Sequence, residues 1–153
     1  MNNPKLIQEK NEIDSLFGQI TGFGGDPYVK SLLTYDLCVR VSGYVESCVR
    51  IILADYSRPR AQDHVRTFVD GRLDRFPNPT FDQICKAIAD FSDQWNRDFK
   101  ARIPDPVRES LRSINVNRNQ IAHGGTSTIT IGQLQRYYQD VIFLIAVLEV
   151  TCQ

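Results

Sequence analysis

Apolar residues recur at steps of three and four along nearly the whole chain, and this spacing restricts the protein to helical folds. The clearest example lies in residues 27–56, where Leu33, Leu37, Val41, Val45 and Val49 follow one another every four residues. Such spacing places apolar side chains on one face of an α-helix. Strand-like alternation is confined to the short segment "STITI" at 127–131, which cannot build a sheet alone. The sequence therefore predicts an all-α protein.

Capping residues, prolines and glycines divide this pattern into helices. Asp26–Pro27 and Asp105–Pro106 each combine a favoured N-cap residue with a proline at the first helical position. Thr80 with Gln83, and Thr130 with Gln133, have the spacing of a capping box. The expected helices span residues 4–20, 27–56, 61–75, 80–101, 106–123 and 130–151.

These helices predict an antiparallel bundle of five to six helices with a long second helix and a long C-terminal helix. Neither a repeat nor a long linker interrupts the chain, so residues 1–153 are expected to form a single domain. The apolar stripe of the helix at 80–101 could be a base-stacking platform, but core packing is favoured. It consists of Ile84, Ile88, Phe91, Trp95 and Phe99.

Charge and hydropathy exclude several classes of protein. Lys plus Arg is 18 and Asp plus Glu is 18, and this balance argues against a protein that coats duplex nucleic acid with its whole surface. It does not exclude a local basic cleft. The polar first residues predict no secretory signal. The longest apolar run, 141–148, is far shorter than the roughly 18 residues of a membrane-spanning helix. We therefore expect a cytoplasmic protein without a membrane partner.

The four cysteines form no CxxC pair and no ligand cluster with the two histidines, so we expect no metal and no other cofactor. Cys38, Cys48 and Cys152 lie within apolar helical patterns, where a reduced thiol behaves as a small hydrophobic group. A structural disulfide is the less favoured alternative.

The segment "RNQIAHGG" at 118–125 is the strongest candidate for a functional site. At about 100° per residue, Asn119 and His123 lie on one helix face, and the long Arg118 side chain can reach them near the helix end. An imidazole exchanges protons near neutral pH, and a guanidinium presents a rigid fork of donors that matches a phosphate. The three residues suit phosphoryl transfer without a metal. The alternative is ordinary capping chemistry before Gly124 and Gly125.

The longer string "INVNRNQIAHGGTSTITIGQLQRYYQDVIFLIAVLE" resembles the signature end of the HEPN superfamily, whose hallmark is an R-x4–6-H motif often written RNxxAHG. Arg118, Asn119, Ala122, His123 and Gly124 match it, and a Thr-capped final helix follows as in that family. The chain is particularly similar to compact bacterial HEPN proteins of toxin–antitoxin and phage-defence systems. The motif and the helix after it cover about a quarter of the chain.

This resemblance implies a homodimer in which the Arg and His of both copies meet at a composite site. Active members of the family are metal-independent endoribonucleases, so RNA would be the substrate and an antitoxin protein a possible partner. His123 would act on the ribose 2′-OH, Arg118 would hold the phosphate, and Asn119 occupies a position that is often polar. The expected products carry a 2′,3′-cyclic phosphate and a 5′-OH. The alternative function is that of a non-catalytic dimeric module that binds a protein, RNA or nucleotide. A third interpretation is a purely structural helical bundle.

Some family members carry an acidic residue on the long early helix with a basic residue four positions on, and Glu46 and Arg50 fit that spacing. The favoured interpretation is a solvated ion pair between these two residues. The alternative is a supporting role at the candidate site. His64 is expected to be a surface histidine. The basic residues of the middle third could guide RNA, but interleaved acids favour a solvated face. They are Arg58, Arg60, Arg66, Arg72 and Arg75.

Overall fold

A computed structural model describes residues 3–74 and 77–153, and within these ranges it contains seven α-helices and no strand. They are α1 (Pro4–Thr21), α2 (Pro27–Ser57), α3 (Asp63–Leu73), α4 (Phe81–Ala89), α5 (Asp93–Arg102), α6 (Asp105–Ala122) and α7 (Ile131–Thr151). The all-α prediction is confirmed, and so are the long second and C-terminal helices, of 31 and 21 residues.

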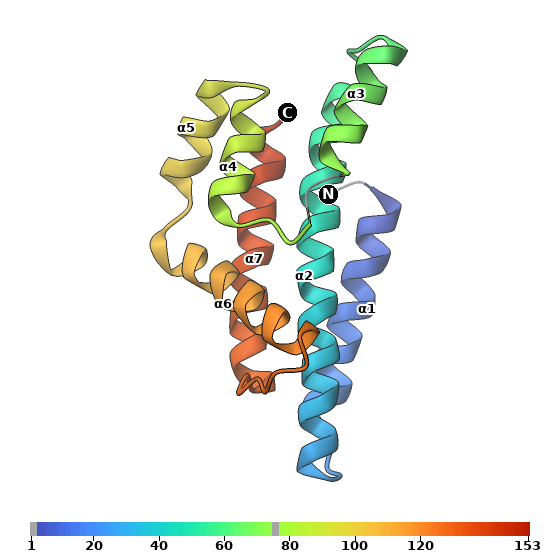
Figure 1. Cartoon of the computed structure of the whole chain (residues 1–153), viewed down its shortest axis with the longest axis vertical. Coiled ribbons are helices and arrows are strands. Elements are labelled where there is room, and N and C mark those ends of the chain that lie inside the picture. Colours follow the sequence, from blue (N-terminus) through green and yellow to red (C-terminus); the bar gives the residue numbers. More distant parts are fainter. Residues whose placement is uncertain (1–2, 75–76) are drawn as a thin grey trace.

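The long helices α2 and α7 pack against each other in the centre of the bundle (Figure 1). Helix α1 lies along α2 and also contacts α7, whereas α6 crosses both long helices obliquely. Helices α4 and α5 pack against each other beside the far half of α7, and α3 extends from the end of α2. This arrangement leaves the end of α6 lying across the first half of α2.

A single apolar core runs through the bundle and contains Leu37, Val41, Ile114, Leu144 and Leu148, each almost inaccessible to solvent. The expected stripe of residues 80–101 belongs to this core: Ile84, Ile88 and Phe99 are buried, and Phe91 and Trp95 pack against it half-buried. Core packing is thus confirmed over a base-stacking platform.

Three of the expected N-terminal caps are present. The Asp26 carboxylate accepts hydrogen bonds from the backbone N–H groups of Tyr28 and Val29 at 2.7 and 3.2 Å. Both capping boxes, Thr80 with Gln83 and Thr130 with Gln133, form in full. Each cap satisfies N–H groups that a helix start otherwise leaves without a partner.

Two expectations about helix ends are wrong. Residues 80–101 form two helices, because Ser92 adopts extended backbone angles and its hydroxyl accepts from Trp95 N, which caps a new helix. Asp105 is not an N-cap: α6 already begins at Asp105, and the carboxylate instead pairs with Arg108 within the first turn at 3.4 Å. The helix expected at 61–75 ends at Leu73, and Arg75 lies outside the described residues.

Candidate functional site

Helix α6 ends at the glycine pair, as the sequence predicts. His123 is the C-cap residue, and Gly124 adopts a φ of +71°, the left-handed conformation that glycine reaches without steric cost. Gly124 N donates to Ile121 O at 3.1 Å and Gly125 N to Gln120 O at 2.8 Å, the paired bonds of a Schellman motif. The chain therefore turns sharply just after His123 and leaves residues 122–126 exposed.

The candidate residues lie together on the last turns of α6, with different exposure. Arg118 is half-buried, whereas Asn119 and His123 are exposed. Arg118 Nη1 donates to the side-chain oxygen of Asn119, Oδ1, at 3.3 Å. The backbone N–H of His123 donates to the backbone carbonyl oxygen of Asn119 at 3.1 Å. In the described part of the chain no hydrogen bond holds the His123 imidazole, which is free to meet a ligand.

Arg118 has no carboxylate partner among the described residues, unlike most of the arginines there. Seven arginines form ion pairs with carboxylates: Arg40, Arg50, Arg58, Arg66, Arg72, Arg108 and Arg112. Arg118 is absent from the ion pairs of residues 3–74 and 77–153, and its described partner is the neutral amide of Asn119. A half-buried guanidinium without a counter-ion favours an anionic ligand.

Contacts with α2 bracket the segment that carries these residues. Before it, the Cys38 thiol contacts Ile114 O at 3.8 Å and the Ser42 hydroxyl lies 3.5 Å from Asn115 Oδ1. After it, the Tyr35 hydroxyl donates to the carbonyl oxygen of Ser127. The two ends of the stretch from Asn115 to Ser127 therefore contact α2 at points about two helical turns apart.

A buried polar network at the base of this stretch was not anticipated from the sequence. The Asn115 side chain, 8% exposed, donates to Pro79 O at 3.1 Å, and the Ser42 hydroxyl donates to Asn78 Oδ1 at 2.9 Å. The Glu46 carboxylate accepts from Asn78 N at 2.9 Å. These bonds join α2, the segment 77–79 and α6 one turn before Arg118. The signal available in the sequence is the spacing of Asn115, four residues before Asn119 on the same helix.

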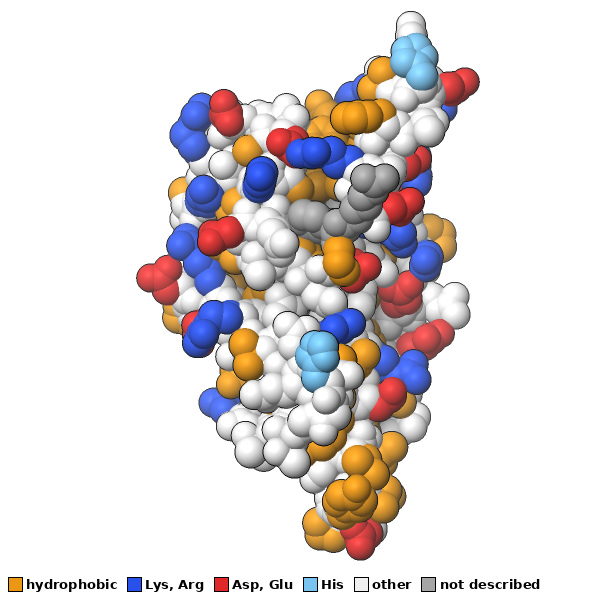
Figure 2. Space-filling view, viewed as in Figure 1, with side chains coloured by type: hydrophobic (Ala, Val, Ile, Leu, Met, Phe, Trp, Pro, Cys, Tyr) orange, Lys and Arg blue, Asp and Glu red, His pale blue; other side chains and the backbone are white. Residues whose placement is uncertain are grey.

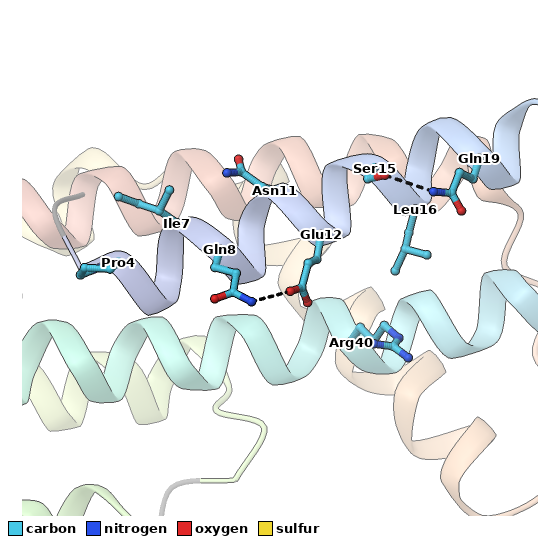
Figure 3. Close-up of a pocket in the computed structure, with 9 residues that line it drawn as sticks. All are labelled: Pro4, Ile7, Gln8, Asn11, Glu12, Ser15, Leu16, Gln19 and Arg40. Atoms are coloured by element: carbon cyan, nitrogen blue, oxygen red, sulfur yellow. Dashed lines mark hydrogen bonds between the residues drawn. The ribbon is translucent and has the colours of Figure 1, made fainter.

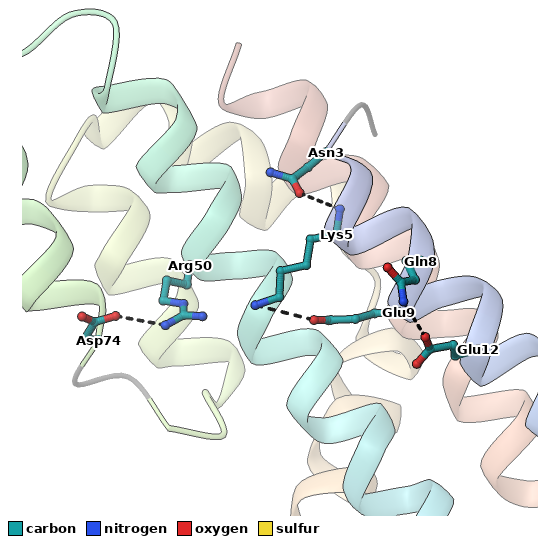
Figure 4. A network of polar contacts seen from close by, with 7 residues as sticks. All are labelled: Asn3, Lys5, Gln8, Glu9, Glu12, Arg50 and Asp74. Carbon is teal, nitrogen blue, oxygen red and sulfur yellow. Dashed lines mark hydrogen bonds and ion pairs between the residues drawn. The ribbon is translucent and has the colours of Figure 1, made fainter.

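Glu46 and Arg50 do not form the expected ion pair within the described residues. Glu46 accepts from the backbone of Asn78, and Arg50 Nη1 pairs with Asp74 Oδ1 at 3.0 Å (Figure 4). Asn78, whose N–H binds Glu46, adopts the left-handed conformation with φ 45°. A role for either residue at the candidate site stays a prediction.

The other candidates lie away from the end of α6. His64 is exposed on α3, a helix that lies beside the end of α2 and away from α6 (Figure 1). Arg58, Arg66 and Arg72 pair with Asp55, Asp63 and Asp90, while Arg60 lies over the Tyr56 ring. Both signs of charge are mixed over the visible face (Figure 2). The solvated-face interpretation of this basic group is supported for its described members.

A groove of about 780 Å³ lies on the outer side of α1 (Figure 3). Its lining is mostly polar residues of α1, together with Arg40 of α2, whose guanidinium is paired with Asp36. None of the candidate residues on α6 contributes to it. The groove is therefore separate from the candidate site.

All four cysteines are free and buried. Burial raises the pKa of the Cys38, Cys48 and Cys152 thiols to about 12 and also raises that of Cys85. Among the described residues, no group of three or more His, Cys, Asp and Glu side chains could hold a metal ion. No helix in this part of the chain is long and apolar enough to cross a membrane.

The helical bundle, with Arg118, Asn119 and His123 on the last turns of α6, is that of a small HEPN-type domain. The family model described as RiboL-PSP-HEPN matches residues 5–152, so the chain belongs to this HEPN family along nearly its entire length. Comparison with curated proteins and with solved structures gives no match.

Proposed function

We propose that this protein is a metal-independent endoribonuclease of the HEPN type, acting as a homodimer in a toxin–antitoxin or phage-defence system. Family membership supports a HEPN domain, a class that commonly cleaves RNA. The proposal rests on two groups of the last turns of α6: the Arg118 guanidinium, which has no carboxylate partner among the described residues, and the exposed His123 imidazole. RNA offers a phosphate that a guanidinium can bind and, next to it, a ribose hydroxyl from which an imidazole can accept a proton.

In the proposed reaction the ribose 2′-oxygen attacks the adjacent phosphorus while the bond from phosphorus to the 5′-oxygen breaks. The His123 imidazole of one copy accepts the proton of the 2′-OH, and the imidazolium of the second copy donates a proton to the leaving 5′-oxygen. The products are a 2′,3′-cyclic phosphate and a 5′-OH. The proposal uses two copies because the reaction needs both a base and an acid, and the other histidine of the chain, His64, lies on α3 and not on α6.

Arg118 has two roles in this proposal. It binds the phosphate before reaction, and it stabilises the charge that accumulates on the equatorial oxygens as the phosphorus becomes five-coordinate. Asn119 orients the guanidinium through the bond from Nη1. Its exposed amide can also donate to a phosphate oxygen.

A non-catalytic HEPN module that binds RNA, a nucleotide or a protein is the second candidate. One observation favours it: the Glu46 carboxylate and the Arg50 guanidinium are both engaged elsewhere. A site without a supporting acid could bind a phosphate and leave it intact. Binding without cleavage separates this candidate from the first.

The test is cleavage of a mixed-sequence RNA in the presence of EDTA. We expect wild-type protein to cut and both His123→Ala and Arg118→Ala to lose at least 100-fold in rate, with His64→Ala as the matched histidine control. A substrate with 2′-deoxyribose at the cut position should resist cleavage. Retention of wild-type rates by His123→Ala and Arg118→Ala would remove the enzyme proposal.

A further inference from the structure

Two polar side chains join the chain just before the candidate site to the chain just after it. Asn117 precedes Arg118 on α6, and Ser127 lies four residues beyond His123. The Ser127 hydroxyl donates to Asn117 Oδ1 at 2.7 Å, across ten residues of sequence. This bond, called the Asn117–Ser127 clamp, closes the segment that carries the Arg118 guanidinium and the His123 imidazole into a loop.

The neighbours of the clamp fix the orientation of both side chains. The Asn117 amide nitrogen donates to Ser113 O at 2.8 Å, and a carbonyl oxygen can only accept, so the amide oxygen points toward Ser127. The Ser127 hydroxyl accepts from Ile129 N at 3.2 Å, which leaves its single proton for Asn117. The two side chains therefore hold each other in one orientation.

The clamp lies largely out of solvent, whereas the site that it encloses is open. Ser127 is 4% exposed and Ile129 6%, and Asn117 is half-buried. Residues 122–126 are all exposed. A hydrogen bond shielded from water is stronger than one in solvent, because its surroundings have a lower dielectric constant. The exposed turn is therefore held by a protected bond at its base.

His123 depends on this support more than the other site residues do. Arg118 and Asn119 lie within α6, and the helical backbone sets the direction of their side chains. His123 is the C-cap, with φ −91° and ψ 12°, so its backbone has left the helical geometry. The direction of the imidazole follows from the turn that leads back toward the start of α7 (Figure 1). Ser127 is the first buried residue after that turn.

We propose that Asn117 and Ser127 are positioning residues for RNA cleavage, because the clamp between them holds the His123 imidazole where it can act on the phosphate that Arg118 binds. The inference rests on the proposed function, in which both groups act on the same phosphate. In this role Asn117 and Ser127 act through His123 and do not contact RNA. A displacement of about 1 Å can lower a catalysed rate about 100-fold, so loss of the clamp affects the maximal rate more than RNA binding.

Two contacts outside the clamp allow its contribution to be measured separately. The bond from the Tyr35 hydroxyl to Ser127 O involves the main chain of Ser127, so it is kept when the serine side chain is replaced. Ser110 is a matched control on α6: it is 5% exposed, and its hydroxyl donates to Asp140 Oδ2 at 2.5 Å. It precedes Arg118 by about 12 Å along the helix axis. Ser110→Ala therefore removes a similar buried bond and leaves the clamp intact.

The first test compares the maximal rate and the KM of RNA cleavage in EDTA. We expect Ser127→Ala and Asn117→Ala to lower the maximal rate at least about tenfold with KM changed less than about threefold, and Ser110→Ala to keep the rate within about twofold. Circular dichroism checks that each variant is folded. Asn117→Ala tests the clamp even if Ser127→Ala does not fold, since alanine favours the helix. Wild-type rates in the folded clamp variants, or an equal loss in Ser110→Ala, would overturn the assignment.

A second test observes the turn without RNA. Backbone order parameters from ¹⁵N relaxation should fall from about 0.85 toward 0.6 at Gly124, Gly125 and Thr126 in Ser127→Ala, and stay unchanged in Ser110→Ala. If they fall but the wild-type protein cuts no RNA, the ribonuclease proposal is removed and the clamp remains the support of the turn. If the wild type cuts RNA and the turn of Ser127→Ala stays rigid, the positioning role is removed and the ribonuclease remains.

Discussion

Tyr35 and Ser127, 92 residues apart in the sequence, are joined by a hydrogen bond from the tyrosine hydroxyl to the serine carbonyl oxygen. The buried Ser127 is also fixed by its own side chain, which donates to Asn117 Oδ1 at 2.7 Å and accepts from Ile129 N at 3.2 Å. One residue thus anchors the segment between α6 and α7 to both α2 and α6. The turn that carries His123 is held at this point.

Tyr35→Phe should destabilise the protein by about 1 kcal/mol, because it removes the hydroxyl and leaves the Ser127 carbonyl without this partner. Urea unfolding measures the change, and hydrogen exchange should become faster at Ile129 N, whose acceptor is Ser127 Oγ. The control is Tyr28→Phe at a highly exposed tyrosine, which should leave the midpoint unchanged. Equal midpoints for Tyr35→Phe and wild type would show that the bond does not stabilise the fold.

Gly124→Ala should cost about 1 kcal/mol or more, since its φ of +71° places a β-carbon in the left-handed region. The matched control is Gly18→Ala within α1, where a new β-carbon meets no atom within 4 Å. There alanine should stabilise by about 0.5–1 kcal/mol, because it favours the helix over the unfolded chain. Thermal unfolding of the two variants should therefore shift in opposite directions, and a shift in the same direction would contradict the assigned turn.

The sequence predicts features that depend on near neighbours. The stop at Gly124, the Asp26 cap and both capping boxes rest on residues within a few positions of one another, and all are present. The break at Ser92 was missed because the apolar stripe continues across it, and serine alone does not distinguish a cap from a mid-helix position.

Contacts between distant segments could not be predicted in the same way. Asn78 lies between two prolines, and only the fold shows that its backbone N–H meets Glu46, 32 residues away. A local sequence motif identifies Arg118 and His123 as candidates. That Arg118 has no carboxylate partner among the described residues depends on the positions of all the carboxylates in the fold.

Glu46→Gln separates a structural role of this side chain from a role at the site. An amide oxygen can still accept from Asn78 N, so the free energy of unfolding should change by less than about 1 kcal/mol, whereas Glu46→Ala should lose about 1–2 kcal/mol. If Glu46 only holds segment 77–79, RNA cleavage by Glu46→Gln should stay within about twofold of wild type. A fall of tenfold or more with stability retained would assign the carboxylate to the site.

The stability of the fold should decline in alkaline solution because its buried thiols resist ionisation. Burial raises the pKa of Cys38, Cys48 and Cys152 from 9.0 to about 12, so the unfolded chain loses these protons at a lower pH than the folded chain. The stabilisation is complete below pH 9 and is lost as the pH rises toward 12. Each thiol should contribute a loss on the order of 1 kcal/mol per pH unit in that window.

Urea unfolding between pH 7 and 11 measures this dependence. The triple variant with alanine at positions 38, 48 and 152 serves as the comparison, and its unfolding free energy should vary less above pH 9. In the native state the thiols should also react with a disulfide reagent at pH 8 much more slowly than in urea, since the thiolate is the reactive form. Rapid reaction of all four cysteines without urea would contradict their burial.

Arg118→Lys tests whether the guanidinium acts through its shape or only through its charge. Lysine keeps the positive charge but offers a single ammonium group, so it cannot bind two phosphate oxygens side by side or keep the bond from Nη1 to Asn119 Oδ1. We expect RNA cleavage to fall at least tenfold in the maximal rate with a smaller change in RNA affinity, because the fork is needed most as charge accumulates on phosphorus. The matched control is Arg97→Lys on α5, because the Arg97 guanidinium also donates to a neutral amide, Gln94 Oε1, at 2.9 Å. Equal loss of affinity and of maximal rate would indicate that Arg118 only binds RNA, and unchanged values for both would remove it from the site.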